Sequence, residues 1–305
     1  MINIKEIEKL RTFSKDKRIS IKEFYKSLNK LNKNLFEDEI IYFQKSDEKR
    51  KIKLPILGFK TKKSGKAIWI IAGVHGEEPA GPNALIKNIS LLNNLAKSIP
   101  LVLIPLANPA GYWRDWRYPN QKRARMKWSA PSVGNMDHLV INDKTKKAFA
   151  SKPLFDDSKY LGEYIIKNSK TRKPFLVLDL HEDESLRKLY LYSHVKNDIS
   201  RKIGSEIVKI LKKSGFEFYE DRKTTFDEEI KSGIVESETD GSLDDLLASK
   251  KIFTDGRISK GPSAKTVIVV ETTTKGFPLK KRVHAHSLII KQAEKFYKEI
   301  LESKD

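Results

Sequence analysis

The sequence predicts an α/β fold, in which helices cover a sheet of buried strands. Three short apolar runs, at residues 67–73, 175–180 and 266–270, have the length and aliphatic content of strands buried on both faces. Residues 80–89, which follow the first run, have a helical composition, and Pro79 suits a first helical turn. A chain of 305 residues with 39% hydrophobic content is long enough for one large core of this kind.

Both ends of the chain are expected to be helical. Residues 1–50 carry apolar side chains at mostly helical spacing, and no Gly or Pro precedes Pro55 to mark a flexible linker. We therefore divide the chain into a helical N-terminal extension, residues 1–50, packed on a main domain, residues 51–305. Residues 286–302 are expected to form a C-terminal helix that buries Leu288, Ile289, Ala293, Phe296 and Ile300.

A histidine and a glutamate follow the first apolar run. His75 and Glu78 fall on the turn between the strand and the helix, and Gly76 lets this turn stay tight. In open α/β sheets, ligands bind at the carboxyl ends of strands, so both side chains should project into one cleft. A His three residues before a Glu also occurs by chance in exposed loops, so this pair alone does not establish a metal site.

A second histidine lies at the end of the second run. His181 stands among four acids, Asp179, Glu182, Asp183 and Glu184, which core packing does not explain. Asp179 or Asp183 could orient the imidazole by accepting a hydrogen bond from it, and the remaining acids could form a solvated loop. Two imidazoles and one carboxylate, with a position left open for water, are the ligands typical of a catalytic zinc site.

The third run is followed by an acid, Glu271. Because residues 266–270 are all β-branched, the Glu271 carboxylate should emerge at the end of a strand. There it could take a proton from an activated water molecule and pass it to a leaving amine. The alternative is a helix-capping or salt-bridged loop acid.

Four motifs together carry a resemblance to a known family. They are HGEE at 75–78, NPAGY at 108–112, DLHED at 179–183 and ETTTKGFPL at 271–279. In this order they resemble the zinc carboxypeptidase superfamily, which includes the succinylglutamate desuccinylase and aspartoacylase group of deacylases. The likeness covers roughly residues 50–300. It implies a three-layer α/β fold with a mixed, mostly parallel twisted sheet between helices.

The resemblance also implies roles for individual residues. His75, Glu78 and His181 match the ligands of one Zn²⁺ ion per chain, and Glu271 matches the general base. Arg117, in a Trp-Arg pair after the NPAGY motif, is the nearest match to an arginine that polarises the substrate carbonyl, a task that suits a guanidinium. A basic surface loop lying over aromatic side chains is the alternative for any single arginine of this segment.

The sequence departs from the family where a substrate carboxylate would be held. Relatives that cleave C-terminal residues usually carry an Asn-Arg pair after an Asp-containing stretch, and residues 132–143 have no such pair. Arg123 or Arg125 could bind the carboxylate from the preceding loop instead. Otherwise, the protein does not recognise a C-terminal carboxylate in the usual way.

Composition excludes several classes of protein. The chain has no cysteine, which excludes disulfides and thiolate metal sites. Its N-terminus has no apolar stretch long enough for export or for a membrane span, so we expect a cytoplasmic location and no membrane partner. The net charge of +20 raises a nucleic-acid-binding role as a rival, but the lysines are scattered and favour a generally Lys-rich composition.

The sequence thus predicts a zinc-dependent hydrolase of amide bonds that acts on a peptide or an N-acyl amino acid. A carboxypeptidase-like peptidase is the first hypothesis. An N-acyl amino acid deacylase with the same centre is the alternative, and a nucleic-acid-binding protein without enzymatic activity is the third. The first two share their chemistry and differ in the shape of the substrate pocket.

Overall fold

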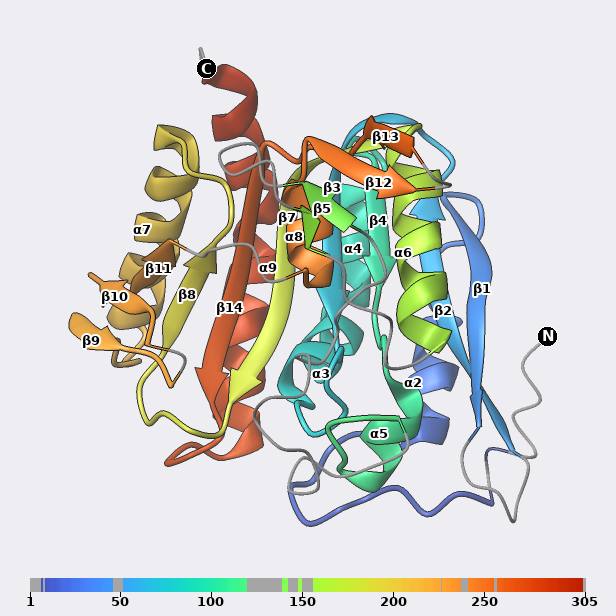
Figure 1. Ribbon diagram of the computed structural model, residues 1–305. Helices are drawn as coiled ribbons and strands as arrows, with labels where there is room; N and C mark the ends of the chain where they lie inside the picture. Colours follow the sequence, from blue (N-terminus) through green and yellow to red (C-terminus); the bar gives the residue numbers. More distant parts are fainter. Residues whose placement is uncertain are drawn as a thin grey trace.

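A mixed sheet of ten strands runs through the described part of this computed structural model (Figure 1). The structure describes residues 7, 9–45, 52–119, 139–141, 148–149, 156–225, 227–236, 241–254 and 257–303. Across the sheet, the strands are β1 (Phe36–Lys45), β2 (Lys53–Thr61), β4 (Leu101–Ile104), β3 (Gly65–Ala72), β7 (Arg172–Asp183), β14 (Thr266–Thr273), β8 (Tyr190–Ser193), β11 (Ile234–Glu236), β10 (Glu229–Lys231) and β9 (Asp221–Lys223).

The four central strands, β4, β3, β7 and β14, run parallel to one another. Antiparallel neighbours flank them, with β2 beside β4 and β8 beside β14. Along β3, Ile68 and Ile70 enter the core on one face of the sheet, and Trp69 and Ile71 enter the core on the other. A strand buried on both faces requires a continuous apolar run, which is why residues 67–73 show no polar alternation.

Helices cover both faces of this sheet. On one face, α2 (Ile21–Leu28), α3 (Ala80–Lys87), α4 (Ile89–Leu95), α7 (Asp198–Lys213) and α9 (Leu279–Glu302) share one core with the strands. On the other face lie α6 (Asp156–Ser169) and α8 (Leu243–Ala248), and Figure 1 shows α9 behind the sheet and α6 in front of it. The predicted three-layer α/β fold is therefore confirmed.

The short helix α5 (Pro109–Arg114) lies at the lower edge of the sheet in Figure 1. A second sheet, in the order β13 (Arg257–Lys260), β12 (Lys251–Thr254), β5 (Leu139–Ile141) and β6 (Ala148–Phe149), lies near the opposite end.

The expectation that residues 1–50 are helical is right for α2 and wrong for β1. Residues 36–45 instead pair antiparallel with β2 over its whole length. This stretch contains consecutive β-branched and aromatic residues, which favour a strand beside an existing strand edge. Ile7, Leu10 and Phe24 also belong to the main core. The division of the chain at residue 50 stays a prediction.

Three elements extend beyond the bounds expected from hydrophobicity. Strands β7 and β14 continue past their apolar runs, so His181 and Glu271 lie within strands rather than on the loops that follow. The parallel ladder between them reaches the pair Thr273 and Asp183, because backbone hydrogen bonding does not require apolar side chains. Helix α9 begins already at Leu279, directly after the extended residue Pro278.

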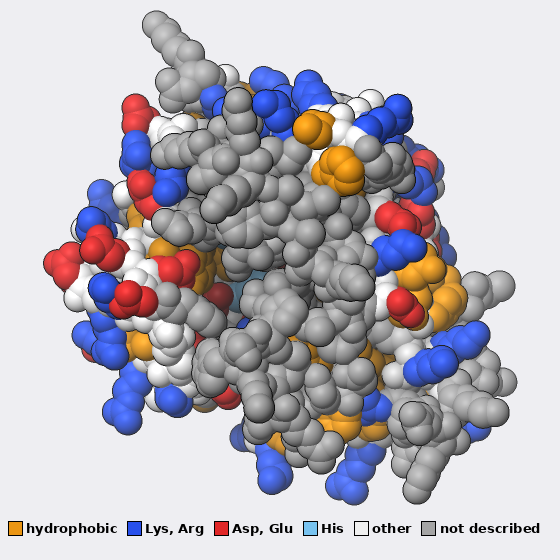
Figure 2. All heavy atoms as spheres, viewed as in Figure 1, with side chains coloured by type: hydrophobic (Ala, Val, Ile, Leu, Met, Phe, Trp, Pro, Cys, Tyr) orange, Lys and Arg blue, Asp and Glu red, His pale blue; other side chains and the backbone are white. Residues whose placement is uncertain are grey.

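Charged side chains are mixed over the face of the molecule shown in Figure 2. Lys and Arg side chains are spread among Asp and Glu side chains on its described surface, without one continuous basic stripe. A histidine side chain is visible in a hollow near the centre of this face, beside acidic side chains. Among the described helices, none is both long and apolar enough to cross a lipid bilayer.

Candidate active site

The turn after β3 carries His75 and Glu78 and packs directly against α5. A Cβ atom added to Gly76 would lie 2.1 Å from the carbonyl carbon of Gly111, so only glycine permits this backbone approach. The Gly76 N–H donates a hydrogen bond of 3.3 Å to the carbonyl oxygen of Arg117. The backbone of the turn therefore contacts both α5 and the segment that follows it up to Arg117.

Strand β7 lies parallel to β3 and brings His181 next to this turn. One ligand atom from each of His75, Glu78 and His181 lies within 4.8 Å of the other two. The Glu78 carboxylate lies between the imidazoles, with Oε1 2.6 Å from His75 Nδ1 and Oε2 3.1 Å from His181 Nδ1. Two imidazoles and a carboxylate that converge in a nearly buried position form a donor set that suits Zn²⁺.

Asp179 occupies the other side of the His181 ring. Its Oδ1 lies 3.1 Å from His181 Nε2, its side chain is 1% exposed, and neither oxygen has a hydrogen bond to another described residue. His181 thus presents one ring nitrogen to Asp179 and the other to the Glu78 side. Asp183, the other acid considered for this role, instead accepts hydrogen bonds from Ser185 and Tyr190.

The charges of the three candidate ligands depend on one another. Burial lowers the pKa of His75 to about 4, and the nearby Arg117 acts in the same direction. Burial acts to raise the pKa of Glu78, but His75 and His181 outweigh it and hold this pKa well below its usual value. Burial acts to lower the pKa of His181, but Asp179 outweighs it and raises this pKa well above the usual value. Because a metal ion binds only an unprotonated ring nitrogen, a cation at this site would have to displace the proton from the His181 nitrogen that faces Glu78.

Glu271 lies on β14, directly across from His181 in the parallel ladder and from Tyr190 of β8 in the antiparallel one. Burial raises the pKa of the Glu271 carboxyl group well above its usual value, and the negative charge of Glu78 adds to this effect. A carboxyl group whose pKa is shifted toward neutrality can both accept and release a proton. The position and environment of Glu271 therefore suit a proton carrier beside the three candidate ligands.

Arg117 reaches the same cluster from the segment after α5. Its Nη1 lies 3.0 Å from Glu78 Oε1 and 3.3 Å from Glu77 Oε1, and its side chain is mostly buried. The structure thus brings together His75, Glu78, His181, Asp179, Glu271 and Arg117 from separate parts of the chain. Arg123 and Arg125, the expected carboxylate-binding residues, lie outside the described residues.

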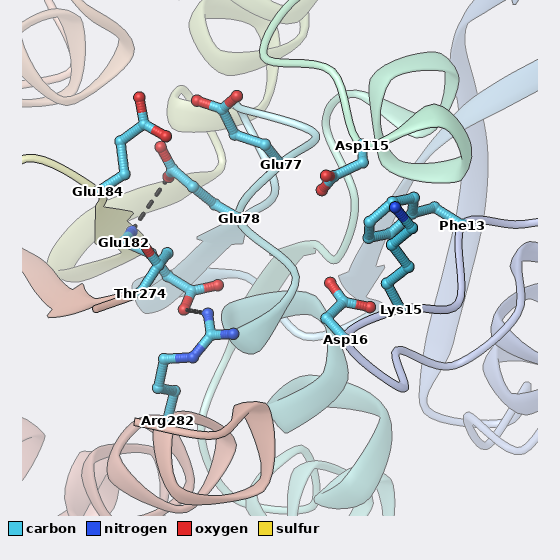
Figure 3. Close-up of a pocket in the computed structure, with 10 residues that line it drawn as sticks. All are labelled: Phe13, Lys15, Asp16, Glu77, Glu78, Asp115, Glu182, Glu184, Thr274 and Arg282. Carbon is cyan, nitrogen blue, oxygen red and sulfur yellow. Dashed lines mark hydrogen bonds and ion pairs between the residues drawn. The ribbon is translucent and has the colours of Figure 1, made fainter. Parts of the chain in front are cut away.

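A cavity of about 340 Å³ opens beside Glu78 (Figure 3). Figure 3 shows Glu77, Glu78 and Glu184 on one side of this cavity and Asp16 and Asp115 on the other. Its described wall has six carboxylates and two cationic side chains: Asp16, Glu77, Glu78, Asp115, Glu182 and Glu184, with Lys15 and Arg282. The described wall is therefore acidic.

Glu182 is a buried site residue whose role the sequence did not reveal. Its backbone N–H donates a 3.1 Å hydrogen bond to Glu78 Oε2, while its carboxylate accepts one of 2.7 Å from the Ala80 N–H. The same carboxylate pairs with Arg282 of α9, as Figure 3 shows. Burial raises the pKa of Glu182 to about 7. Because Arg282 is 100 positions away in the chain, the local sequence gives no signal of this pair.

Comparisons with known proteins agree with this fold. A family model described as zinc carboxypeptidase matches residues 21–138, a span that includes His75 and Glu78. A solved structure titled "Putative metallopeptidase" from Shewanella baltica OS155 has a TM-score of 0.67 at 21% identity, and the match covers 91% of each chain. A search of curated proteins by sequence finds no match.

Two eukaryotic structures are also similar. Bovine thrombin-activatable fibrinolysis inhibitor, solved in complex with tick carboxypeptidase inhibitor, has a TM-score of 0.58 at 15% identity, covering 94% of this chain and 98% of that chain. Carboxypeptidase A from Helicoverpa armigera has a TM-score of 0.56 at 13% identity, covering 98% of this chain and 76% of that chain. At such identities the likeness establishes the fold. The resemblance of this chain to the zinc carboxypeptidases is thus confirmed, by the family model over residues 21–138 and by the shared fold.

Proposed function

We propose that this protein is a zinc-dependent hydrolase of amide bonds, and specifically a carboxypeptidase-like peptidase. The observation that carries the proposal is the convergence of His75, Glu78 and His181 at one buried point, with Glu271 on the neighbouring strand. The zinc carboxypeptidase family match and the carboxypeptidase-like fold support a metallopeptidase-type hydrolase.

His75, Glu78 and His181 would hold the metal ion. When bound there, zinc would supply Lewis acidity, which polarises the substrate carbonyl and lowers the pKa of water. Asp179 would keep the imidazole of His181 in the orientation that ligation needs.

The chain's own residues would carry the proton and orient the substrate. Glu271 would accept a proton from the attacking water molecule as its oxygen adds to the carbonyl carbon. The same carboxyl group would then release this proton to the leaving nitrogen as the carbon–nitrogen bond breaks. Arg117, near Glu78, would donate hydrogen bonds to the carbonyl oxygen as negative charge develops on it.

Reconstitution with zinc tests this function directly. Metal-free protein should be inactive, and activity should return with about one equivalent of Zn²⁺. A matched panel of N-blocked dipeptides and N-acyl amino acids distinguishes the two candidate substrate classes. Preferential cleavage of the peptides supports a peptidase, whereas exclusive cleavage of the N-acyl amino acids would replace it with a deacylase. Zinc-independent cleavage, or no cleavage of either class, would contradict the proposed function.

Recognition of a substrate carboxylate by Arg123 or Arg125 is part of the proposal. Their guanidinium groups suit a carboxylate, whereas the described wall of the cavity is acidic. Arg123→Ala or Arg125→Ala should raise KM for free-acid peptides and leave KM for the amidated peptides unchanged. Equal cleavage of free-acid and amidated peptides by the wild-type protein would show that carboxylate recognition is absent.

A further inference from the structure

Arg18, in the segment before α2, is a fully buried cation at the edge of the candidate site. Its side chain is 0% exposed, and its guanidinium carbon lies 5.0 Å from the ring centroid of Phe13 and 5.1 Å from that of Tyr112. A buried guanidinium is costly unless its donors are satisfied. The hydrogen-bond acceptors around the Arg18 guanidinium therefore indicate its role.

All five N–H groups of the guanidinium can be accounted for. Nη1 donates to the carbonyl oxygens of Gly76, at 3.1 Å, and Tyr112, at 2.6 Å. Nη2 donates to Asp115 and to Asp16. Nε donates to Asp16 Oδ2 at 2.9 Å. Arg18 thus joins three separate segments of the chain.

These partners belong to the parts that carry the site chemistry. The Gly76 carbonyl lies in the turn between the candidate ligands His75 and Glu78, and Tyr112 lies in α5. Asp115 ends α5 in the left-handed conformation, with φ of 63°, and the chain then leads directly to Arg117. The guanidinium therefore ties the metal-binding turn to the residue from which the Arg117 segment departs.

We propose that Arg18 is a positioning residue, which fixes the segment carrying Arg117 relative to the turn between His75 and Glu78. The inference rests on the proposed function, because it gives Arg117 a target at the metal site. Among the described residues, the hydrogen bonds and ion pairs of Arg18 go to residues other than the three candidate ligands, and the proposal gives Arg18 no contact with the substrate. Its planar fork is essential, since a lysine ammonium cannot bridge two carbonyls and two carboxylates at once.

The local fold should survive the loss of this fork. The neighbouring residue Ile19 is held independently, because its N–H donates to Asn83 Oδ1 at 2.9 Å and its carbonyl accepts from the Tyr112 hydroxyl at 2.8 Å. Arg18→Lys should therefore loosen the junction between the turn and α5 without detaching the N-terminal segment.

A control substitution is available at Arg172, at the start of β7. Arg172 is also buried and donates to the carbonyl oxygen of Thr61 at 2.7 Å, but it lies at the opposite end of β7 from His181. Arg172→Lys thus reports the general effect of replacing a buried arginine.

Hydrogen–deuterium exchange on the zinc-free protein tests the positioning itself, independently of activity. In Arg18→Lys, exchange should become faster in the peptides that cover residues 75–78 and 108–119, and it should not change there in Arg172→Lys. Unchanged exchange in Arg18→Lys would overturn the inference, whether or not the wild-type protein hydrolyses any substrate.

A double-mutant cycle with Arg117→Ala tests the consequence for catalysis. Arg18→Lys should lower kcat by roughly tenfold to a hundredfold, as expected when a catalytic group is displaced by about 1 Å. In the Arg117→Ala background, the same substitution should change kcat by less than about twofold, because its effect passes through Arg117. If the losses of kcat caused by Arg18→Lys and Arg117→Ala multiply in the double variant, the inference is overturned. A wild-type protein that is inactive on all amide substrates would instead overturn the proposed function.

Discussion

Replacing Asp179 with Asn should weaken zinc binding without weakening the fold. Asp179 Oδ1 lies 3.1 Å from His181 Nε2, and its oxygens have no hydrogen bond to another described residue. The isosteric change therefore removes one interaction, that between the Asp179 carboxylate and the His181 imidazole, which orients and polarises the ring. Carboxylates placed behind a histidine ligand contribute about tenfold to a hundredfold in metal affinity, which corresponds to about 1.4 to 2.7 kcal/mol.

The stability of the zinc-free protein should change little. Burial raises the pKa of Asp179, and Asp179 in turn raises the pKa of His181, so Asn avoids the cost of a buried carboxylate but loses its favourable interaction with the imidazole. Competition with a chelator should show the loss of affinity. Thermal unfolding at saturating zinc should show that the metal raises Tm of the variant by about 2 to 4 °C less than it raises Tm of the wild type.

A matched control lies on the same strand at Asp183, whose carboxylate accepts hydrogen bonds from Ser185 and Tyr190. Asp183→Asn should leave zinc affinity within about twofold of the wild type, a change too small to reflect loss of a group behind a ligand. An Asp179→Asn variant that binds zinc as tightly as the wild type would refute the role of Asp179 in orienting His181.

Three further substitutions give separate expectations. Glu271→Gln should retain zinc and lower kcat by about a hundredfold to ten-thousandfold in single-turnover assays, and unchanged turnover would assign the proton transfer to another acid. Burial raises the pKa of Asp157 to about 6, so the folded wild type loses stability as pH rises from about 4 to above 6. Denaturant titrations should therefore find Asp157→Asn more stable than the wild type at pH 8, by at most about 3 kcal/mol, and no more stable below pH 4. Gly76→Ala should lower stability by about 1 to 3 kcal/mol and weaken zinc binding, because its Cβ would overlap Gly111. Gly215→Ala, which meets no atom within 4 Å, should leave zinc binding intact.

The fold class was predictable because the central strands are buried on both faces. A strand such as β3 must then be apolar throughout, and its run at residues 67–73 stands out from a charged chain. The polar residues that end such runs mark the edge where parallel strands meet. For this reason the sequence alone indicated His75, His181 and Glu271 as neighbours.

Features that no run of apolar residues marks in the sequence were harder to predict. Strand β1 is partly exposed and charged, and its pairing with β2 decides its conformation. The role of Arg18 has no signal in the local sequence, because its carbonyl partners Gly76 and Tyr112 lie 58 and 94 positions further along the chain. Contacts over such separations exist only once the sheet is assembled, so no local pattern reveals them.

The zinc content of the purified, reconstituted protein tests the central claim most directly. The wild type should hold about one zinc ion per chain, because His75, Glu78 and His181 supply the three protein ligands of a catalytic site. His181→Ala should lose the ion, whereas His284→Ala, which alters an exposed histidine on α9, should retain it. Equal zinc content in the wild type and in His181→Ala would contradict the proposed metal centre.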